Sequence, residues 1–274
     1  MKMLHPISVR ARCVAACSMV LLLCAGAWAA EKSAPAARDL FNGKDLSGWY
    51  TFLHDHGKGV DPKAVFTVAD GVIRISGEEW GCITTEEEFE NYHALIEFKW
   101  GEKTWANRVD AARDSGFLVH SVGEDGGYSR TWMYSIEVQM IEGGTGDLLA
   151  VGDEGDLISI TSDIDTASPS TGKVYKTGGA PTTITGGRID WWGRDLGWKD
   201  VKGFRGAQDV EHPVGEWNRL EVLCLGDRVT VWLNGRLVNE CYNVKPTKGK
   251  LQIQSEGAEL FVRKVQLQPL AAEE

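Results

Sequence analysis

The sequence is poor in cysteine and has no long apolar run after residue 30. No stretch in that part of the chain reaches the ~20 apolar residues of a transmembrane helix. Three cysteines remain there, and an odd number does not make a disulfide framework. The alternation after Arg219 predicts a three-strand meander with turns at Gly226-Asp227 and Asn234-Gly235. Cys224 and Cys241 would then lie two strands apart, about 9 to 10 Å and too far for a bridge, so we expect buried thiols.

Basic residues are also scarce. The chain has 29 Lys and Arg residues against 39 Asp and Glu residues, a net charge of -10. An acidic protein is poorly suited to binding phosphate groups, so we do not expect a nucleic-acid partner. The sequence contains no clustered His and Asp residues with the spacing of a metal-ligand set. A divalent-cation cofactor is compatible with the sequence but is not predicted by it, and the metal ligands are unknown.

The first thirty residues have the parts of a secretory signal sequence. Lys2, Arg10 and Arg12 precede an apolar run from Val14 to Ala27, and "AWA" at 27–29 supplies the small residues that a signal peptidase recognises. We expect a signal peptide at 1–29, a periplasmic or secreted protein, and no membrane contact after cleavage. Loss of three positive charges would change the net charge to about -13. An uncleaved membrane anchor is the alternative, although the apolar run is shorter than the ~20 residues that span a bilayer.

Short alternating stretches bounded by Gly, Asn and Asp make up most of the remaining chain. "VFTVADGVIRIS" predicts a hairpin around Asp70-Gly71, and similar strands follow to the end of the chain. This pattern predicts an all-β fold, a β-sandwich or jelly roll, as one domain over about 38–270. A short helical turn is expected in "GEKTWANRVDAARDSG". The Gly-rich segment at about 166–214 is expected to be an ordered insertion, because its Trp residues argue against disorder.

One stretch, "MYSIEVQMIEGG" (Met133–Gly144), combines strand alternation with carboxylate and amide side chains. Successive residues of a strand point to opposite faces, so the two sets of side chains should separate. The expected core set is Tyr134, Ile136, Val138 and Met140, and the opposite set is Ser135, Glu137 and Gln139. "ALIEFKW" and "LQIQSE" repeat the pattern and present Glu97, Lys99, Gln252 and Gln254. A solvent-facing sheet surface is the alternative explanation, chiefly for Glu97 and Lys99.

Glu137, Gln139 and Glu142 also have the E-x-x-x-x-E spacing of laminarinase-type retaining glycosidases. Such enzymes need two carboxyl groups ~5 to 5.5 Å apart and a group that tunes their pKa values. Gln139 stands where those enzymes have Asp, and its amide has no charge. Ordinary retaining glycoside hydrolysis is therefore an alternative and not the main interpretation.

Several motifs in combination resemble the DUF1080 family, also called the 3-keto-disaccharide hydrolase domain, over nearly all of the chain after the signal. They are "DLFNGKDLSGW" (39–49), "DSGFLVH" (114–120), "SIEVQMIEGGTGD" (135–147), "GEWNRLEVLC" (215–224) and "LQIQSEGAELFVRKVQL" (251–267). The resemblance implies a concanavalin A-like β-sandwich (jelly roll) with a concave carbohydrate-binding face. It also implies activity on glycosides that are oxidised to a ketone at C3.

A 3-keto substrate determines the chemistry that is expected. The ketone makes the C2 proton acidic, so a base can remove it and the glycosidic oxygen can leave by elimination. We expect Glu137 to be the base and His120, whose ordinary pKa is near 6.5, to be the candidate acid. Lys99 or a bound cation would stabilise the enolate. The expected substrate-binding residues are Gln139, Glu97, Tyr128, Trp132, Trp191, Trp192, Gln254 and, from the family motifs, Asp147 and Glu256.

Each of these assignments has a structural alternative. An aromatic residue is more often a packing residue than a sugar platform, and a lone His at a strand end is commonly hydrogen-bonded or packed. Asp147 could cap a turn. At the level of the whole protein, a carbohydrate-binding module or lectin with the same face is the alternative from another functional class.

Overall fold

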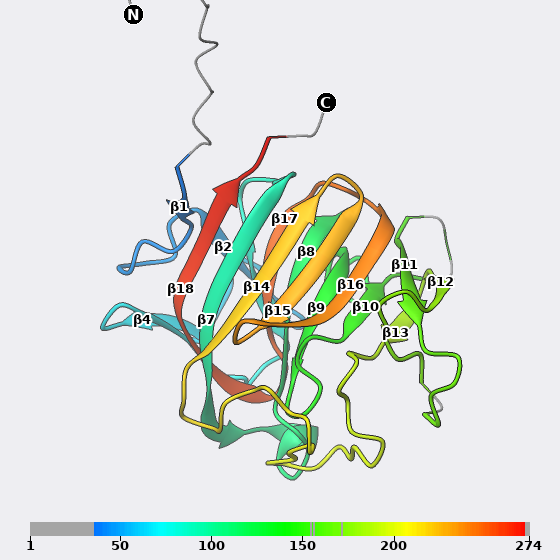
Figure 1. Ribbon diagram of the computed structural model, residues 1–274. Helices are drawn as coiled ribbons and strands as arrows, with labels where there is room; N and C mark the ends of the chain where they lie inside the picture. The colour runs from blue at the N-terminus through cyan, green and yellow to red at the C-terminus, as the bar shows by residue number, and fades with distance from the viewer. Residues whose placement is uncertain (1–35, 154, 156, 171, 272–274) are drawn as a thin grey trace, which may run out of the picture. The chain divides into compact units, whose positions relative to one another are not determined.

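The computed structural model describes residues 36–153, 155, 157–170 and 172–271 (Figure 1). The predicted signal sequence at 1–29 lies outside the described residues. The one helical element in the described part is a 3-10 turn, η1 (Ala106–Arg108), within the stretch where a helical turn is predicted. No helix among the described residues is long and apolar enough to cross a membrane.

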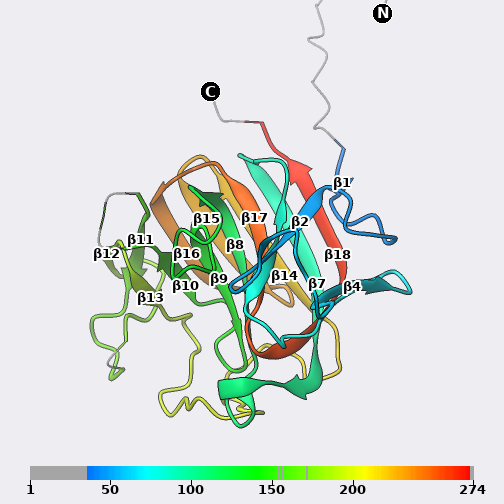
Figure 2. The ribbon, with the colours of Figure 1, turned by 180° about the vertical axis from the view of Figure 1, so that it is seen from behind.

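Two antiparallel sheets form the fold, and the views from front and back show them stacked face to face (Figures 1 and 2). The ten-stranded sheet has the order β12 (Ala180–Ile184), β11 (Ser159–Ile164), β16 (Arg236–Lys245), β15 (Arg228–Leu233), β14 (Asn218–Leu225), β7 (Tyr92–Thr104), β18 (Ala258–Pro269), β5 (Val72–Ile75) and β4 (Phe66–Ala69), with β1 (Arg38–Asp39) also paired to β18. The eight-stranded sheet has the order β13 (Gly187–Ile189), β10 (Leu148–Val151), β9 (Tyr134–Ile141), β8 (Asp114–Val122), β17 (Lys250–Ser255), β6 (Gly81–Thr85), β2 (Trp49–Leu53) and β3 (Gly57–Lys58). The predicted all-β sandwich is therefore confirmed.

Tight turns occur where the sequence predicts them. β4 and β5 are joined at Asp70-Gly71, and β15 and β16 at Asn234-Gly235, with positive φ at all four residues. Such two-residue turns match the right-handed twist of the paired strands, and Asn, Asp and Gly adopt them readily. The meander β14–β15–β16 places Cys224 and Cys241 two strands apart, and Cys82, Cys224 and Cys241 are free and buried, as expected.

The hydrophobic core lies between the two sheets. In β9 the core side chains are those that the alternation predicts, Tyr134 at its edge and Ile136, Val138 and Met140 inside. β8 contributes Phe117 and Val119, and β17 contributes Leu251 and Ile253. The alternate residues of these three adjacent strands therefore project from the other side of the eight-stranded sheet, which we call the outer face.

The described residues of the segment at about 166–214 include two strands. β12 lies at the edge of the ten-stranded sheet and β13 at the edge of the eight-stranded sheet, so the segment joins one sheet to the other. The residues after β13 run along the lower end of the sandwich in Figure 1, beside the end of β7 and η1. Asp200 contacts Arg108 of η1 there, and the Lys202 amide donates to the Asp110 carbonyl.

Candidate active site

Three neighbouring strands of the eight-stranded sheet bring polar side chains together on the outer face. β8 lies between β9 and β17, with Gly116 paired to Gln139 on one side and Phe117 paired to Ile253 on the other. Glu137, Gln139 and Gln254 project from the outer face, as the alternation predicts. They are almost fully buried rather than solvated, so this surface is not an ordinary exposed sheet face.

Gly116 provides the space in which two of these side chains meet. A Cβ atom at this position would lie 2.4 Å from Glu137 Oε1 and 2.4 Å from Gln254 Oε1. Real Cβ contacts are essentially never that short, so only glycine allows both side chains to lie over β8. The carboxyl group of Glu137 and the amide of Gln254 therefore converge on one point above Gly116.

Neither of these two groups is used to hold the fold together. Among the described residues Glu137 makes no hydrogen bond or ion pair, although its side chain is only 4% exposed. Gln254 Oε1 is buried and also lacks a hydrogen-bond partner in that part of the chain. Buried polar groups are nearly always paired, so two unpaired groups at one point indicate a place where a ligand supplies the missing partners.

Burial raises the pKa of Glu137 to about 8, and the negative charge of Asp114 raises it further in the same direction. Arg188 opposes this shift, and Asp147 adds to it. A carboxyl group with a pKa near neutrality can accept and return a proton at working pH, which is the property required of a general base.

Glu256 is a second carboxyl group at this site, and it too makes no hydrogen bond or ion pair with the described residues. It lies in the short connection between β17 and β18, which passes from one sheet to the other, and is half-buried. Burial, followed by the charges of Asp114 and Glu137, raises the pKa of Glu256 well above its ordinary value. The charge of Glu137 thus opposes ionisation of Glu256, so the two carboxyl groups are not expected to be ionised together.

A frame of arginine and carboxylate side chains surrounds this pair on two sides. On one side Asp114 accepts a hydrogen bond from Gln139 Nε2 at 2.5 Å and pairs with Arg108, which also pairs with Asp200 at 2.9 Å. Burial, opposed by Arg108, raises the pKa of Asp114 to about 6.

On the other side of the pair Asp147 is completely buried. It accepts from Arg188 at 3.0 Å, from Arg194, and from the backbone amide of Trp191 at 2.8 Å. Burial raises the pKa of Asp147 to about 6, and the two arginines oppose that shift. Arg188 also lies 3.4 Å from Gln139 Oε1. The oxygen and the nitrogen of the Gln139 amide are therefore both hydrogen-bonded. Gln139 orients Asp114 and Arg188 rather than binding a ligand itself.

Several predicted residues lie elsewhere. Glu97 and Lys99 are on β7 in the ten-stranded sheet, on the side away from the core, so the hydrophobic core separates them from Glu137. Glu97 pairs with Arg263 at 2.5 Å, and the Lys99 ammonium lies 5.0 Å from the centroid of the Trp217 ring. The structure therefore does not bring Lys99 or Glu97 to the site.

His120 is turned away from Glu137 by a bulge in β8. The residue has φ of 53° where the pairing register shifts, and its fully buried ring packs edge-on against Tyr92 at 5.8 Å. Its Nδ1 lies 2.9 Å from the Pro246 carbonyl oxygen. Burial lowers the pKa of His120 to about 4, so the ring is neutral at physiological pH. A neutral imidazole on the core side of the sheet does not suit the expected acid.

The predicted aromatic residues divide into two groups. Trp191 is buried in the main core, and Trp192 donates to the Leu237 carbonyl at 2.7 Å, beside Trp191. Tyr128 and Trp132 instead lie in the loop that covers part of the outer face, in a small apolar cluster with Leu118 and Cys82. Only this second pair is near the site, because Leu118 follows Gly116 on the same face of β8.

Glu142 does not form a catalytic pair with Glu137. Its carboxylate accepts from Arg113 Nη1 at 2.6 Å, from the Arg113 amide at 2.9 Å and from the Gly203 amide at 2.8 Å. These donors fix Glu142 at the end of β9, where it connects the insertion to the sandwich. The E-x-x-x-x-E spacing therefore has a structural explanation here.

Sequence reasoning missed Asp114, Gly116, Arg108 and Arg188. The first two had a usable signal, because Asp114 and Gly116 occupy alternate positions at the start of the "DSGFLVH" stretch and so share one face. The arginines had none, since η1 and β13 reach the site only through the folding of a loop and an insertion. Within the described part of the chain, no group of three or more His, Cys, Asp or Glu side chains is arranged to hold a metal ion.

Replacing Gly116 by Ala tests the convergence over β8. The new methyl group would push aside the ends of the Glu137 and Gln254 side chains, which can move, so folding should be preserved. We expect turnover to fall by about 10²-fold, because small displacements of a reacting group cost that much. The unfolding free energy should change by less than about 1 kcal/mol. Gly186→Ala, where no atom lies closer than 3.4 Å, is the control, and equal activity of both variants would contradict the convergence.

Several solved structures are similar to this chain. A candidate glycosyl hydrolase from Parabacteroides distasonis ATCC 8503 superposes with a TM-score of 0.51 at 21% identity, covering 86% of this chain and 94% of that one. A β-glucanase from Bacillus licheniformis gives 0.46 at 9% identity, covering 88% and 100%. Carbohydrate-binding module CBM66 from Bacillus subtilis gives 0.41 at 11% identity, covering 80% and 94%. The first likeness supports the fold alone, and the comparison with curated proteins found no match.

The family comparison covers most of the chain. The model of the 3-keto-alpha-glucoside-1,2-lyase-like domain matches residues 36–268, which contain every residue of the site described above. This range also includes all the motifs on which the sequence resemblance depends. The chain is thus a carbohydrate-active protein, and it belongs to the family of 3-keto-alpha-glucoside-1,2-lyase-like domains.

Proposed function

We propose that this protein cleaves 3-ketoglycosides by elimination, with Glu137 as the base. The observation that supports the proposal is a buried carboxyl group with a raised pKa and no partner among the described residues, next to a free amide and a second free carboxyl group. Membership of a 3-ketoglucoside lyase-like family agrees with this chemistry. Subsequent addition of water would give the hydrolysis product.

The reaction needs one proton acceptor and one proton donor. Glu137 takes the C2 proton, and the electrons of the C–H bond form the enolate of the C3 ketone. When the ketone forms again, a C1=C2 double bond appears and the C1–O bond to the leaving group breaks. The leaving oxygen receives a proton from Glu256, whose raised pKa keeps it protonated. The products are an alcohol and a 2-hydroxy-3-ketoglycal.

Arg188 is placed to stabilise the enolate, and Gln254 to bind a substrate hydroxyl. Arg188 brings a positive charge close enough to oppose the rise in the pKa of Glu137, and that charge would act in the same way on an enolate oxygen. Gln254 places its amide oxygen, an acceptor, above Gly116, where it would accept a hydrogen bond from a substrate hydroxyl. Arg188 is itself held by Asp147 at 3.0 Å, so the charge is positioned before the substrate binds.

The alternatives differ in the groups they require. Retaining hydrolysis of the laminarinase type uses the carboxylate at the E-x-x-x-x-E spacing, and here that residue, Glu142, is taken by three donors. A lectin needs no base. In a lectin nothing would offset the free-energy cost of desolvating Glu137 without a partner.

A direct test follows proton and product together. Purified protein is incubated in D₂O with a methyl 3-ketoglycoside and with its unoxidised parent, and NMR monitors deuterium at C2 and release of methanol. We expect exchange and cleavage of the keto substrate alone. Cleavage of the unoxidised parent would instead support glycoside hydrolysis, and binding without exchange would support a lectin.

The pH dependence follows from the raised pKa of Glu137. A base must be deprotonated to act, and Glu137 holds its proton below about pH 8, so kcat/KM should rise with pH up to that region. Asp114→Asn removes a charge that raises this pKa and should move the rising limb to lower pH. Arg188→Met removes a charge that lowers it and should move the limb to higher pH. Shifts in the same direction, or none, would exclude Glu137 as the titrating group.

A further inference from the structure

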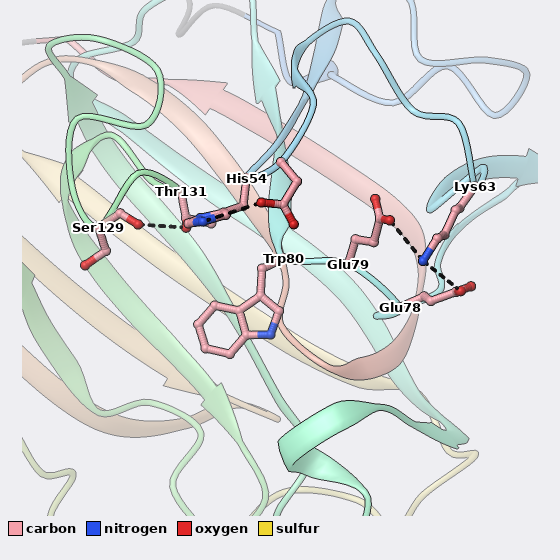
Figure 3. Close-up of a pocket in the computed structure, with 8 residues that line it drawn as sticks. His54, Lys63, Glu78, Glu79, Trp80, Ser129 and Thr131 are labelled. Atoms are coloured by element: carbon pink, nitrogen blue, oxygen red, sulfur yellow. Dashed lines mark hydrogen bonds and ion pairs between the residues drawn. The ribbon is translucent and has the colours of Figure 1, made fainter.

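Arginine side chains of this protein pair with carboxylates through one edge of the guanidinium group. The Nε–H and one Nη–H point in the same direction, so together they can bind both oxygens of a carboxylate. Arg219 shows the complete arrangement, with Nε 2.9 Å from Glu221 Oε1 and Nη2 2.9 Å from Glu221 Oε2. The lysine in the pocket of about 470 Å³ that Figure 3 shows is also paired, since Lys63 lies 3.0 Å from Glu79 and 3.3 Å from Glu78. An arginine that uses only half of its edge would have a donor left for a ligand.

Arg108 is such an arginine. Its side chain is 13% exposed, and its Nη2 pairs with Asp114 Oδ2. The other oxygen of Asp114 accepts from Gln139 Nε2 at 2.5 Å, so another donor occupies the position that would complete the fork. Arg108 Nε is buried and has no hydrogen-bond partner among the residues that the structure describes. A buried donor on a cation is rarely left unpaired, so this one indicates a place for an acceptor oxygen of a ligand.

The surrounding backbone holds Arg108 beside Glu256. The Trp105 amide donates to the Gly257 carbonyl at 2.8 Å, which ties the start of η1 to the connection between β17 and β18. A Cβ atom at Gly257 would lie 2.7 Å from Arg108 Cγ, so the arginine stem lies directly on the residue that follows Glu256. Asp200, from the insertion, accepts from Arg108 Nη1 at 2.9 Å. The guanidinium is therefore fixed from two sides, and its free Nε–H is on the edge that faces the site.

The charge of Arg108 acts on Glu256 more than on Glu137. Burial raises the pKa values of both carboxyl groups. Arg188 is the cation that opposes this rise at Glu137, whereas Arg108 and Arg188 both oppose it at Glu256. Arg108 therefore lies on the side of the site where, in the reaction proposed above, the leaving oxygen receives its proton.

We propose that Arg108 is a further catalytic group and that its free Nε–H binds the leaving oxygen of the substrate. This assignment rests on the proposed function. When the C1–O bond breaks, its electron pair moves onto the leaving oxygen, and the hydrogen bond from Arg108 stabilises the negative charge that develops there. Arg108 keeps its own proton, because a guanidinium is not an acid in proteins. Glu256 supplies the proton that completes the alcohol.

Two substrates with the same oxidised ring test this division of roles. A methyl 3-ketoglycoside has a poor leaving group that needs stabilisation, whereas a 4-nitrophenyl 3-ketoglycoside releases a phenolate that delocalises its own charge. Arg108→Met should lower cleavage of the methyl glycoside by about 10²- to 10³-fold and cleavage of the nitrophenyl glycoside by less than about tenfold. Above about pH 8, where Glu137 is ionised, deuterium exchange at C2 should stay near the parental rate, because it precedes breakage of the C1–O bond. Arg219→Met, which changes an arginine with a complete fork on the other sheet, is the control and should alter neither rate.

Two further variants separate the contact with substrate from the support of Asp114. Arg108→Ala leaves room for free guanidinium, which should restore part of the cleavage of the methyl glycoside, whereas sodium chloride should not. Asp200→Asn loosens Arg108 without removing it and should give a smaller loss with the same dependence on the leaving group. Equal losses with both leaving groups, with or without guanidinium, would mean that Arg108 only holds Asp114 and would overturn the assignment alone. A parental protein that neither exchanges C2 nor cleaves either substrate would instead remove the proposed reaction, and this assignment with it.

Discussion

Glu137→Gln is expected to lower the turnover of a 3-ketoglycoside by about 10²-fold or more, the scale typical of a general base. Gln has nearly the same size as Glu and can still form hydrogen bonds, but it has no electron pair that can accept the C2 proton. Because Glu137 has no partner among the described residues, its replacement breaks no contact that stabilises the fold. The desolvation that raises its pKa is also removed, so the melting temperature should stay the same or rise.

Glu256→Gln is the matched variant, since it changes the second free carboxyl group in the same way. If Glu137 is the base and Glu256 the acid, Glu137→Gln should abolish both deuterium exchange at C2 and cleavage. Glu256→Gln should slow cleavage more than exchange, because the enolate can still form and return. Exchange at the parental rate in Glu137→Gln would show that another group removes the proton, and Asp114 would be the next residue to replace.

The sequence predicted the strands and their faces well because alternation is a local property. The side chains of Glu137, Gln139 and Gln254 lie on the outer face for the same reason that Ile136 and Val138 lie in the core. Alternation does not determine which sheet a strand joins. Glu97 and Lys99 have the same pattern as Glu137 and Gln139, yet β7 pairs into the ten-stranded sheet.

His120 shows a second limit of sequence reasoning. The two-residue alternation gives the direction of a side chain at a strand end only if the strand is regular up to that residue. β8 is not, because it has a bulge between Val119 and Val122. The bulge gives His120 a positive φ and turns its ring toward Tyr92. Nothing in "GFLVHSV" identifies that bulge, because it depends on the pairing of β8 with both β9 and β17.

The electrostatic frame depends on long-range contacts and was therefore hidden from the sequence. Arg188 is 41 residues from Asp147, and Arg108 is 92 residues from Asp200. The identity of Gln139 did contain information. An amide can accept from Arg188 and donate to Asp114 at once, whereas an Asp at that position could only accept. Gln139 therefore bridges the two halves of the frame without adding another charge beside Glu137.

Arg113→Met is expected to cause the largest loss of stability, about 3 to 5 kcal/mol of unfolding free energy. Arg113 and Glu142 are both buried, with the Nη1–Oε1 distance at 2.6 Å, and Arg113 Nε also donates to the Gly101 carbonyl at 2.8 Å. Removing the guanidinium leaves the Glu142 carboxylate buried without its counter-charge. Urea unfolding at constant m-value measures the loss.

Two comparisons show whether this loss comes from the uncompensated buried charge. Arg38 and Glu87 form an ion pair of 2.9 Å on the surface, with both side chains about half exposed or more, and Arg38→Met should cost less than about 1 kcal/mol. The double change Arg113→Met with Glu142→Leu removes both buried charges and should be more stable than Arg113→Met alone. A double variant no more stable than Arg113→Met would attribute the loss to packing and to the Gly101 hydrogen bond. Cleavage of the 3-ketoglycoside by folded Glu142→Gln should stay close to the parental rate, because Glu142 holds the insertion in place and does not contact the reacting atoms.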